Sequence, residues 1–261
     1  MNMIKRCVMD SYYSYKALFS YYGIVSYTLF KVINALFQIT FFSLFSIYLF
    51  GEQDATFWVI GNAFMLSSCN SLFGVGVNAT YERIFGTLKY SIVSTTGTVS
   101  RYFIQMFMHI MDGVLNILLG IVFGILFFGL KISVVQFIQL MGIAAVAMVS
   151  ISGFSIFLGN LGLFVRDMTL VLNLVNMLIM ICAGVNYPID TMPIFIRAIS
   201  KITPLSRSIA AARQIIAENY AGIASMLLFE LLTGVVYVVL AALCFQHIEK
   251  IAIKKARLDL V

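Results

Sequence analysis

Six long hydrophobic stretches alternate with short polar segments along the chain. A helix needs about 20 apolar residues to cross the hydrocarbon core of a bilayer. The stretches that reach this length are Ser26–Phe50, Phe57–Val77, Tyr102–Phe128, Val135–Phe164, Thr169–Tyr187 and Ile223–Phe245. Within the third, Gly120 and Gly124 form a GxxxG motif, which allows two helices to approach closely. The pattern therefore predicts an all-α integral membrane protein with six transmembrane helices, in one domain over residues 21–247.

The segment before the first stretch has a different periodicity. Within Met3–Phe19, apolar residues recur at spacings of three and four, whereas Lys5, Arg6 and Lys16 lie largely off that face. This pattern is typical of an amphipathic helix that lies in the membrane surface. We predict such a helix on the cytoplasmic side over residues 1–20. The alternative is an irregular start to the first span.

The segment between the fifth and sixth stretches, residues 187–220, is also unusual. It contains all three prolines of the chain, Pro188, Pro193 and Pro204. Proline removes a backbone donor and stops a helix, so we expect this segment to consist of short pieces. The expected pieces are Ile194–Ile202 and Ser206–Glu218. Short broken helices at a membrane boundary are typical of a re-entrant element on the outer side, and the alternative is an ordinary surface loop.

Composition and charge agree with a membrane protein. Hydrophobic residues make up 61% of the chain and charged residues 11%, whereas about a quarter of the residues in soluble domains are charged. The net charge of +6 does not indicate nucleic-acid binding, because Lys and Arg are not clustered with aromatic residues between them. With both termini in the cytoplasm, 11 of the 17 Lys and Arg residues fall on the inner side, as the positive-inside rule requires. Residues 248–261 would then form a basic cytoplasmic tail.

Polar side chains fall within the predicted spans, where contact with lipid would be costly. Lys31, Asn34 and Gln38 share one face of the first helix, and Asn173 and Asn176 repeat a spacing of three in the fifth. We expect these faces to look inward, toward a partner helix or a pathway. For each residue the alternative is a structural contact between helices. Lys31 has a further alternative, which is to extend its ammonium group to the nearby interface.

Three ionisable residues lie deeper in the predicted spans. His109 and Asp112 are three residues apart in the third helix, close enough to pair, and Glu230 lies about two turns into the sixth. Charges inside a membrane commonly line pathways or proton relays. A hydrogen-bonded structural pair explains His109 and Asp112 equally well.

Catalytic chemistry is missing from the sequence. There is no GxxxxGK[ST] motif, so the phosphate-binding loop of an ATPase is absent. The two histidines and four cysteines form no cluster with metal-ligand spacing. No pair of carboxylates flanks a plausible pocket. We therefore expect that this chain is not an enzyme and holds no metal or cofactor.

Two segments contain motifs that are specific in their order and spacing. The first is Glu82-Arg83-Ile84-Phe85-Gly86-Thr87-Leu88, directly after the second span. The second contains Asn186-Tyr187-Pro188, Met192-Pro193, Thr203-Pro204-Leu205 and then Arg213. They resemble the E-x-x-x-G-T-L signature and the pattern of Pro, Met-Pro, Pro-Leu and Arg in the type-2 family of ABC transporter permeases. The layout of the whole chain is similar to that family.

The resemblance implies roles for both motifs. Residues 81–101 would form a cytoplasmic coupling loop that contacts a separate ATPase subunit, together with the N-terminal helix. The coupling residues would be Glu82, Arg83, Gly86, Thr87 and Leu88. Among these, Glu82 and Arg83 would be the charged contacts, and Gly86 would allow a tight turn. The residues of an outer gate would be Pro188, Pro193, Pro204 and Arg213.

The resemblance also implies a function. ATP and Mg²⁺ would be bound by ATP-binding cassette ATPase subunits. Two permease copies, or one copy and a paralogue, would face each other around a cavity lined by the first, second and fifth spans. The implied activity is ATP-driven export of a drug, an antibiotic or another amphipathic compound across the plasma membrane of a bacterial cell. One alternative is export of a polysaccharide or teichoic acid; another is an ion-coupled secondary transporter that uses His109, Asp112 and Glu230.

Overall fold

The computed structural model describes residues 9, 11–13, 16, 23–50, 55–87, 98–163, 165 and 167–254. This part of the chain is helical and contains no strand, which confirms the all-α prediction. Of the predicted N-terminal helix, only Met9, residues 11–13 and Lys16 are described, and they are helical. The rest of that helix lies outside the described residues.

Five long helices follow the predicted hydrophobic stretches. They are α2 (Ile24–Phe50), α3 (Ala55–Gly76), α6 (Thr98–Phe128), α7 (Val134–Gly159) and α11 (Ile223–Lys254). The fifth stretch forms a shorter helix, α8 (Met168–Cys182). The helix α11 continues past the predicted end at Phe245, so the segment predicted as a tail begins as part of this helix. Residues 255–261 lie outside the described part.

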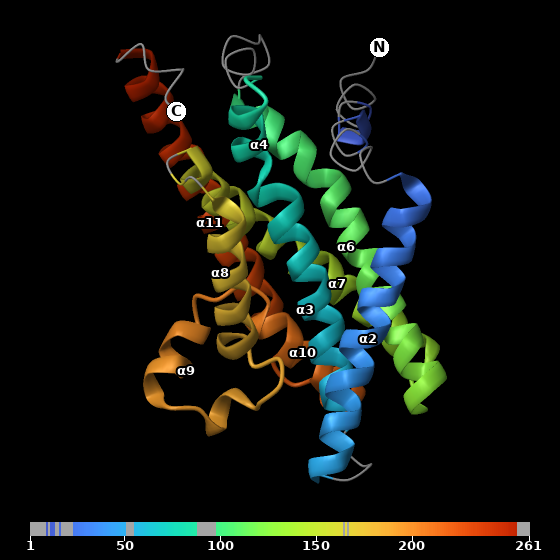
Figure 1. Ribbon diagram of the computed structural model, residues 1–261. Coiled ribbons are helices and arrows are strands. Elements are labelled where there is room, and N and C mark those ends of the chain that lie inside the picture. The colour runs from blue at the N-terminus through green and yellow to red at the C-terminus, as the bar shows by residue number, and fades with distance from the viewer. Residues whose placement is uncertain are drawn as a thin grey trace.

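The number of membrane crossings depends on α8. Within the described residues, five helical segments are long and apolar enough to cross a membrane. The helix α8 has 15 residues, which gives a length of about 22 Å at 1.5 Å per residue, less than the hydrocarbon core of about 30 Å. Figure 1 shows that α8 nevertheless runs along the bundle beside its neighbours. Its crossing, and therefore the total of six, stays a prediction.

The helices lie side by side and alternate in direction (Figure 1). The described N-terminal residues, the short helix α4 (Asn78–Ile84) and the end of α11 lie at one end of the bundle, which we call the terminal end. The opposite end, which we call the distal end, holds the 3-10 helix η3 (Ile189–Thr191) with α9 (Ile194–Ser200) and α10 (Ser206–Ile216). The two pieces predicted for the broken segment match α9 and α10.

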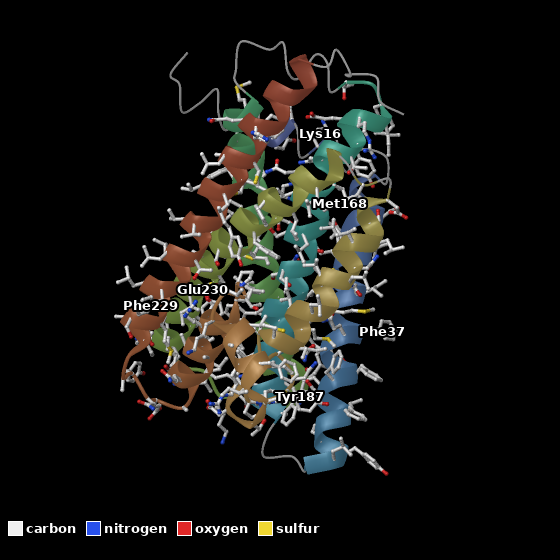
Figure 2. The ribbon with its side chains drawn as sticks, turned by 90° about the vertical axis from the view of Figure 1, so that its left-hand side faces the viewer. Lys16, Phe37, Met168, Tyr187, Phe229 and Glu230 are labelled. Carbon is white, nitrogen blue, oxygen red and sulfur yellow. The ribbon has the colours of Figure 1, made fainter. Side chains whose placement is uncertain are left out.

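The helix α3 forms the centre of the bundle. It packs against α6 and α7, and also against α2, α8 and α10, so side chains on all its sides are buried. By contrast, α2 and α11 leave most of their surface exposed. Figure 2 shows Phe37 of α2 and Phe229 of α11 directed outward. Exposed apolar surface of this kind is expected where helices contact lipid.

Glycines bring α6 close to α3. A Cβ at Gly120 would lie 2.6 Å from the Cβ of Ala63 on α3, and a Cβ at Gly124 would also meet a side chain of α3. Larger side chains at either position would push the two helices apart. The GxxxG motif therefore has the packing role that the sequence predicts.

A similarly close contact joins α7 and α11, so adding one methyl group there should lower the stability of the protein. A Cβ at Gly234 of α11 would lie 2.7 Å from the Cα of Ser150, a backbone atom that cannot rotate away. Gly234→Ala is expected to lower the free energy of unfolding by about 1–3 kcal/mol, measured by thermal unfolding in detergent. The control is Gly142→Ala, because open space surrounds Gly142 on α7. The control should be neutral or slightly stabilising, since alanine favours helix. Equal losses in both variants would contradict the close contact.

Candidate functional site

The first motif forms α4 and a tight turn at the terminal end. Gly86 closes this turn with a φ of +68°, a left-handed conformation that glycine adopts without strain. The Gly86 N–H donates to the carbonyl oxygen of Arg83 at 3.1 Å, and the Thr87 N–H donates to that of Glu82 at 2.8 Å. The tight turn predicted at Gly86 is confirmed. Leu88 lies outside the described residues, as does the segment that follows it up to α6.

The helix α4 is fixed to the connection between α7 and α8. Thr80 Oγ1 donates to the carbonyl oxygen of Gly162 at 3.3 Å, and Arg83 Nη2 donates to that of Val165 at 2.8 Å. Gly162 belongs to the 3-10 helix η2 (Asn160–Leu163), which continues α7. Arg83, predicted as a charged contact for an ATPase, thus also stabilises the terminal end of its own chain.

Large apolar side chains are exposed at the end of α4. Ile84 is 63% exposed, Phe85 is 74% exposed, and Tyr81 lies beside them. Burial of a large apolar side chain contributes about 1.5–3 kcal/mol, so this surface favours contact with a partner. The motif predicted Glu82 and Arg83 as the charged contacts, and the exposure of Ile84 and Phe85 was not predicted. A hydrophobic pattern alone does not distinguish an apolar residue exposed after a span from an apolar residue at the end of the span itself.

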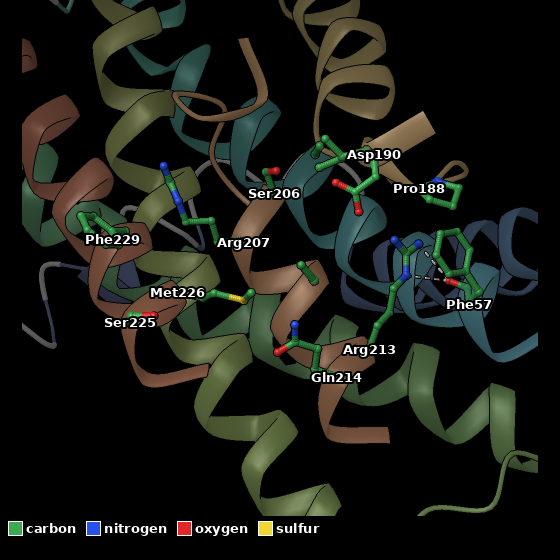
Figure 3. A pocket seen from close by; sticks show the side chains of 13 residues that line it. Phe57, Pro188, Asp190, Ser206, Arg207, Arg213, Gln214, Ser225, Met226 and Phe229 are labelled. Carbon is green, nitrogen blue, oxygen red and sulfur yellow. Dashed lines mark hydrogen bonds between the residues drawn. The ribbon is translucent and has the colours of Figure 1, made fainter. Parts of the chain in front are cut away.

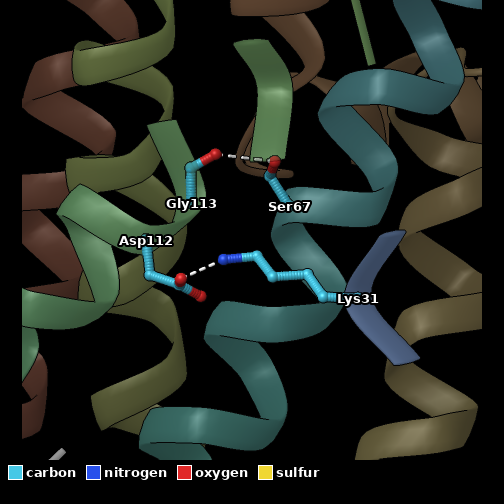
Figure 4. Close-up of polar contacts among 4 residues, drawn as sticks. All are labelled: Lys31, Ser67, Asp112 and Gly113. Carbon is cyan, nitrogen blue, oxygen red and sulfur yellow. Dashed lines mark hydrogen bonds and ion pairs between the residues drawn. The ribbon is translucent and has the colours of Figure 1, made fainter. Parts of the chain in front are cut away.

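An ion pair links α2 and α6 inside the bundle (Figure 4). Lys31 Nζ contacts Asp112 Oδ1, and each side chain is 11% exposed. Beside the pair, Ser67 Oγ of α3 donates to the carbonyl oxygen of Gly113 at 2.8 Å. Lys31 therefore turns into the bundle and does not extend to the interface. Its partner is Asp112, which the sequence pattern had suggested could pair with His109.

His109 lies one helical turn before Asp112 on α6 and is buried. Its imidazole occupies space that a side chain on α3 would otherwise fill, since a Cβ at Gly74 would lie 2.4 Å from the ring. The histidine therefore packs between α6 and α3. Together, Lys31, His109 and Asp112 form a polar region where α2, α3 and α6 meet.

The polar faces of α2 and α8 are only partly directed inward. Asn34 and Asn173 are exposed, whereas Gln38 and Asn176 are half-buried. The Asn173 amide donates to the carbonyl oxygen of Thr169 on its own helix at 3.0 Å. Asn34 and Asn173 are exposed because α2 and α8 lie at the edge of the bundle and these residues fall on faces directed away from its core. Their orientation toward a partner helix or a pathway therefore stays a prediction.

The three prolines separate the short helices of the distal end, as predicted. Pro188 directly precedes η3, Pro193 directly precedes α9, and Pro204 lies two residues before α10. Between Pro204 and α10, Leu205 is buried and has a φ of +75°. A leucine rarely adopts this left-handed conformation, so its surroundings must stabilise it.

Arg213 of α10 links the distal ends of α3 and α8 (Figure 3). Its Nε and Nη2 donate to the carbonyl oxygen of Phe57 at 3.2 and 3.0 Å. Nη1 donates to the carbonyl oxygen of Gly184 at 2.7 Å, and Nη2 donates to that of Val185 at 2.6 Å. The guanidinium also lies 3.3 Å from the centroid of the Phe57 ring. Burial lowers the pKa of Arg213 to about 9, so the group remains charged at neutral pH.

The helix α3 accommodates this contact. A Cβ at Gly61 would lie 2.2 Å from the carbonyl oxygen of Val185, so the turn after α8 can approach only a glycine. On the next residue, Asn62 Nδ2 donates to Asn186 Oδ1 at 3.0 Å. The sequence pattern did not single out Gly61 or Asn62 as contacts for the turn after α8. The available signal was a glycine next to an amide near the start of an apolar helix.

Glu230 of α11 binds the beginning of α10. Its buried carboxylate accepts the N–H of Leu205 on Oε1 at 2.6 Å and the N–H of Arg207 on Oε2 at 3.2 Å. Backbone N–H groups at the start of a helix lack partners within the helix and favour a negative charge. The Arg207 side chain adds a hydrogen bond from Nη1 to Thr233 Oγ1 at 3.2 Å. Glu230 therefore acts as the cap of α10 and stabilises the left-handed Leu205.

The chain matches a known family over most of its length. The family model described as ABC-2 type transporter matches residues 12–217. The chain belongs to the ABC-2 type transporter family. The matched range includes α4, the broken distal segment and Arg213, whereas α11 and its Glu230 follow it. No protein with a curated description matches the sequence significantly.

Membership of the ABC-2 family determines the general role of the chain. It is a multi-pass transmembrane permease component, not itself catalytic, that pairs with an ATP-binding cassette subunit. In the described part of this permease, no group of three or more His, Cys, Asp or Glu side chains could hold a metal ion.

In this ABC-2 permease, the predicted polar and charged residues lie in separate contacts between helices. Lys31 and Asp112 join α2 to α6, whereas Glu230 joins α11 to α10. Arg213 joins α10 to the turn after α8. Each of these charges serves a contact between helices.

Proposed function

We propose that this permease is the membrane subunit of an ATP-driven exporter that moves a drug, an antibiotic or another amphipathic compound out of the cell. ATP and Mg²⁺ are bound by a separate ATP-binding cassette subunit that docks at the terminal end. In this arrangement both termini lie in the cytoplasm of a bacterial cell, and the distal end closes the outer side of the pathway.

The exposed Ile84 and Phe85 are the main support for docking at the terminal end. They lie at the end of α4, on the same end of the bundle as the described ends of the chain (Figure 1). Clustered apolar side chains on such a surface are typical of a protein interface. The helix α4 follows α3 directly, and Thr80 bonds it to η2 while Arg83 bonds it to Val165 just after η2. Movement of a bound partner would therefore reach α3 and α7 together.

The cargo pathway is proposed to lie between two permease copies, or between this chain and a paralogue. The exposed faces of α2 and α8 would line it, with Asn34 and Asn173 among apolar side chains. Such a mixed surface suits an amphipathic compound. Because α3 is buried within its own chain, it would contribute less of the lining than the sequence analysis expects.

A double substitution tests docking at α4. Ile84→Ser with Phe85→Ser is expected to weaken binding of the ATP-binding cassette subunit by at least about tenfold, because two large apolar side chains no longer contribute their burial. The measurement is co-purification of the two subunits, followed by titration of their affinity in detergent. Arg83 is left unchanged because its bond to Val165 also stabilises the terminal end.

The chain offers a matched control at its distal end. Ile194 and Phe195 of α9 repeat the same dipeptide and are 80% and 62% exposed. Ile194→Ser with Phe195→Ser should leave the affinity for the ATP-binding cassette subunit unchanged. If the α4 variant binds as well as the wild type, or if both variants lose binding equally, docking at α4 is wrong.

A further inference from the structure

A cavity of about 480 Å³ lies at the distal end, between α10, the first turns of α11 and the turn that contains η3 (Figure 3). Cavities of this size hold small ligands. Apolar walls come from Ile189, Met226 and Phe229, and polar groups come from Asp190, Arg207 and Gln214. The lining therefore fits a molecule that is itself amphipathic.

The apolar wall of the cavity is continuous with the lipid-facing surface of α11. Phe229 lines the cavity and is also 56% exposed, beside Leu228 and Leu232, which are exposed on the same helix. The membrane span of α11 begins at Ile223, so Phe229 lies in its first two turns. The cavity thus opens where the apolar surface of a span meets its polar end, the level at which lipid head groups lie.

The polar wall presents hydrogen-bonding groups of opposite charge, although the Arg207 guanidinium also interacts with the Glu230 carboxylate and the Phe229 ring. Arg207 bonds to Thr233 and to the carbonyl oxygen of Lys201, which leaves three of its five N–H groups without a partner among the described residues. The Asp190 carboxylate is exposed and likewise has no partner in the described part of the chain. Gln214 Oε1 is buried and accepts no hydrogen bond from any described residue. Figure 3 shows Asp190 and Gln214 on different sides of the cavity.

We propose that this cavity binds the head group of a zwitterionic phospholipid from the leaflet at the distal end. Its phosphate accepts hydrogen bonds from Arg207, as phosphate and guanidinium groups favour. Its ammonium group faces Asp190, and its acyl chains lie along Phe229 and the exposed surface of α11. Arg213 lines the same cavity but uses its N–H groups on the carbonyl oxygens of α3 and of the turn after α8. The proposal is independent of the cargo and of the direction of transport.

Native mass spectrometry of the full-length protein in detergent tests this site. The probes are phosphatidylethanolamine and phosphatidylglycerol with identical acyl chains, which differ in the ammonium group. The wild type should bind phosphatidylethanolamine about fivefold more tightly, the effect of one partly exposed ion pair. Asp190→Asn should abolish this preference. The control Glu218→Gln should keep it, because Glu218 is an exposed acid at the distal end that does not line the cavity.

A further variant tests whether the lipid binds in this cavity, and a competitor separates a lipid from a soluble ligand. Ala210→Phe should lower the binding of both lipids by about tenfold or more, because Ala210 lines the cavity and the larger side chain fills it. Glycerophosphoethanolamine, which has the head group without acyl chains, should not displace the lipid at equal concentration. Equal affinity of the wild type for the two lipids would overturn the proposal. So would a preference that persists in Asp190→Asn, or displacement by the soluble head group.

Discussion

Asp112→Ala is expected to destabilise the permease by about 3–5 kcal/mol, because it leaves the ammonium group of Lys31 buried without its carboxylate. Lys31 is 11% exposed between α2 and α6, so water does not replace the missing partner. A lysine at the centre of a membrane span carries a penalty of a similar size, about 2.5–3.5 kcal/mol. The loss is measured as a fall in the free energy of unfolding of the full-length protein in detergent.

A double variant shows whether the loss of stability comes from the charge of Lys31 or from other contacts of Asp112. Lys31→Met combined with Asp112→Ala should recover most of the lost stability, since it removes both charges together. Asn173→Ala serves as a control, because Asn173 is exposed and, among the described residues, its side chain bonds only to its own helix. This control should change the stability by less than about 0.5 kcal/mol. A single variant as stable as the wild type would show that the pair does not stabilise the bundle. A double variant no better than the single would lead to the same conclusion.

Arg213→Ala is expected to lower the free energy of unfolding by about 3 kcal/mol or more and to abolish transport. The substitution leaves the carbonyl oxygens of Phe57, Gly184 and Val185 without their shared donor, and each hydrogen bond to a charged group contributes about 1.5–3 kcal/mol. It also separates α10 from α3 and α8. Arg213→Lys should recover only part of the stability, because one ammonium group cannot reach all three oxygens in the geometry of a guanidinium.

Arg197→Ala is the matched control for this prediction. Arg197 lies on the neighbouring short helix α9, and its side chain is exposed. Its loss should change the stability by less than about 0.5 kcal/mol. Similar unfolding curves for the two variants would contradict the role of Arg213 as the link between the distal helices.

The sequence predicts where the helices lie because bilayer thickness and proline impose strong local rules. The predicted stretches coincide with α2, α3, α6, α7, α8 and α11 to within a few residues at most ends. Pro188, Pro193 and Pro204 predict the breaks before η3, α9 and α10, since each proline removes a backbone donor. Gly86 predicts a tight turn, and its positive φ agrees. In each case the signal lies within a few residues of the structure that it determines.

The contacts between helices could not be predicted in the same way. Lys31 and Asp112 are 81 positions apart, and Arg213 and Phe57 are 156 positions apart. Helical periodicity places a side chain on a face, but it does not show which helix that face meets. Glu230 illustrates the difference, because an acid inside a span indicates a relay as readily as a cap. Only the position of the start of α10 shows that the carboxylate accepts backbone N–H groups.

Two charges of opposite sign fix the helix α10 to the bundle. Glu230 binds its first turn from α11, and Arg213 in its last turn binds α3 and the turn after α8. The segment from Pro188 to Thr203, by contrast, lies largely on the surface and contains only the short helices η3 and α9. For an outer gate, this distribution favours a fixed α10 and movement in η3 and α9.

Transport by proteoliposomes that contain the purified permease and its ATP-binding cassette subunit tests the proposed export activity most directly. A fluorescent amphipathic drug should cross the membrane only when both subunits and hydrolysable ATP are present. The permease alone should not move the drug, with or without an ion gradient. Movement of the drug by the permease alone, driven by a proton or sodium gradient in the absence of ATP, would contradict the account.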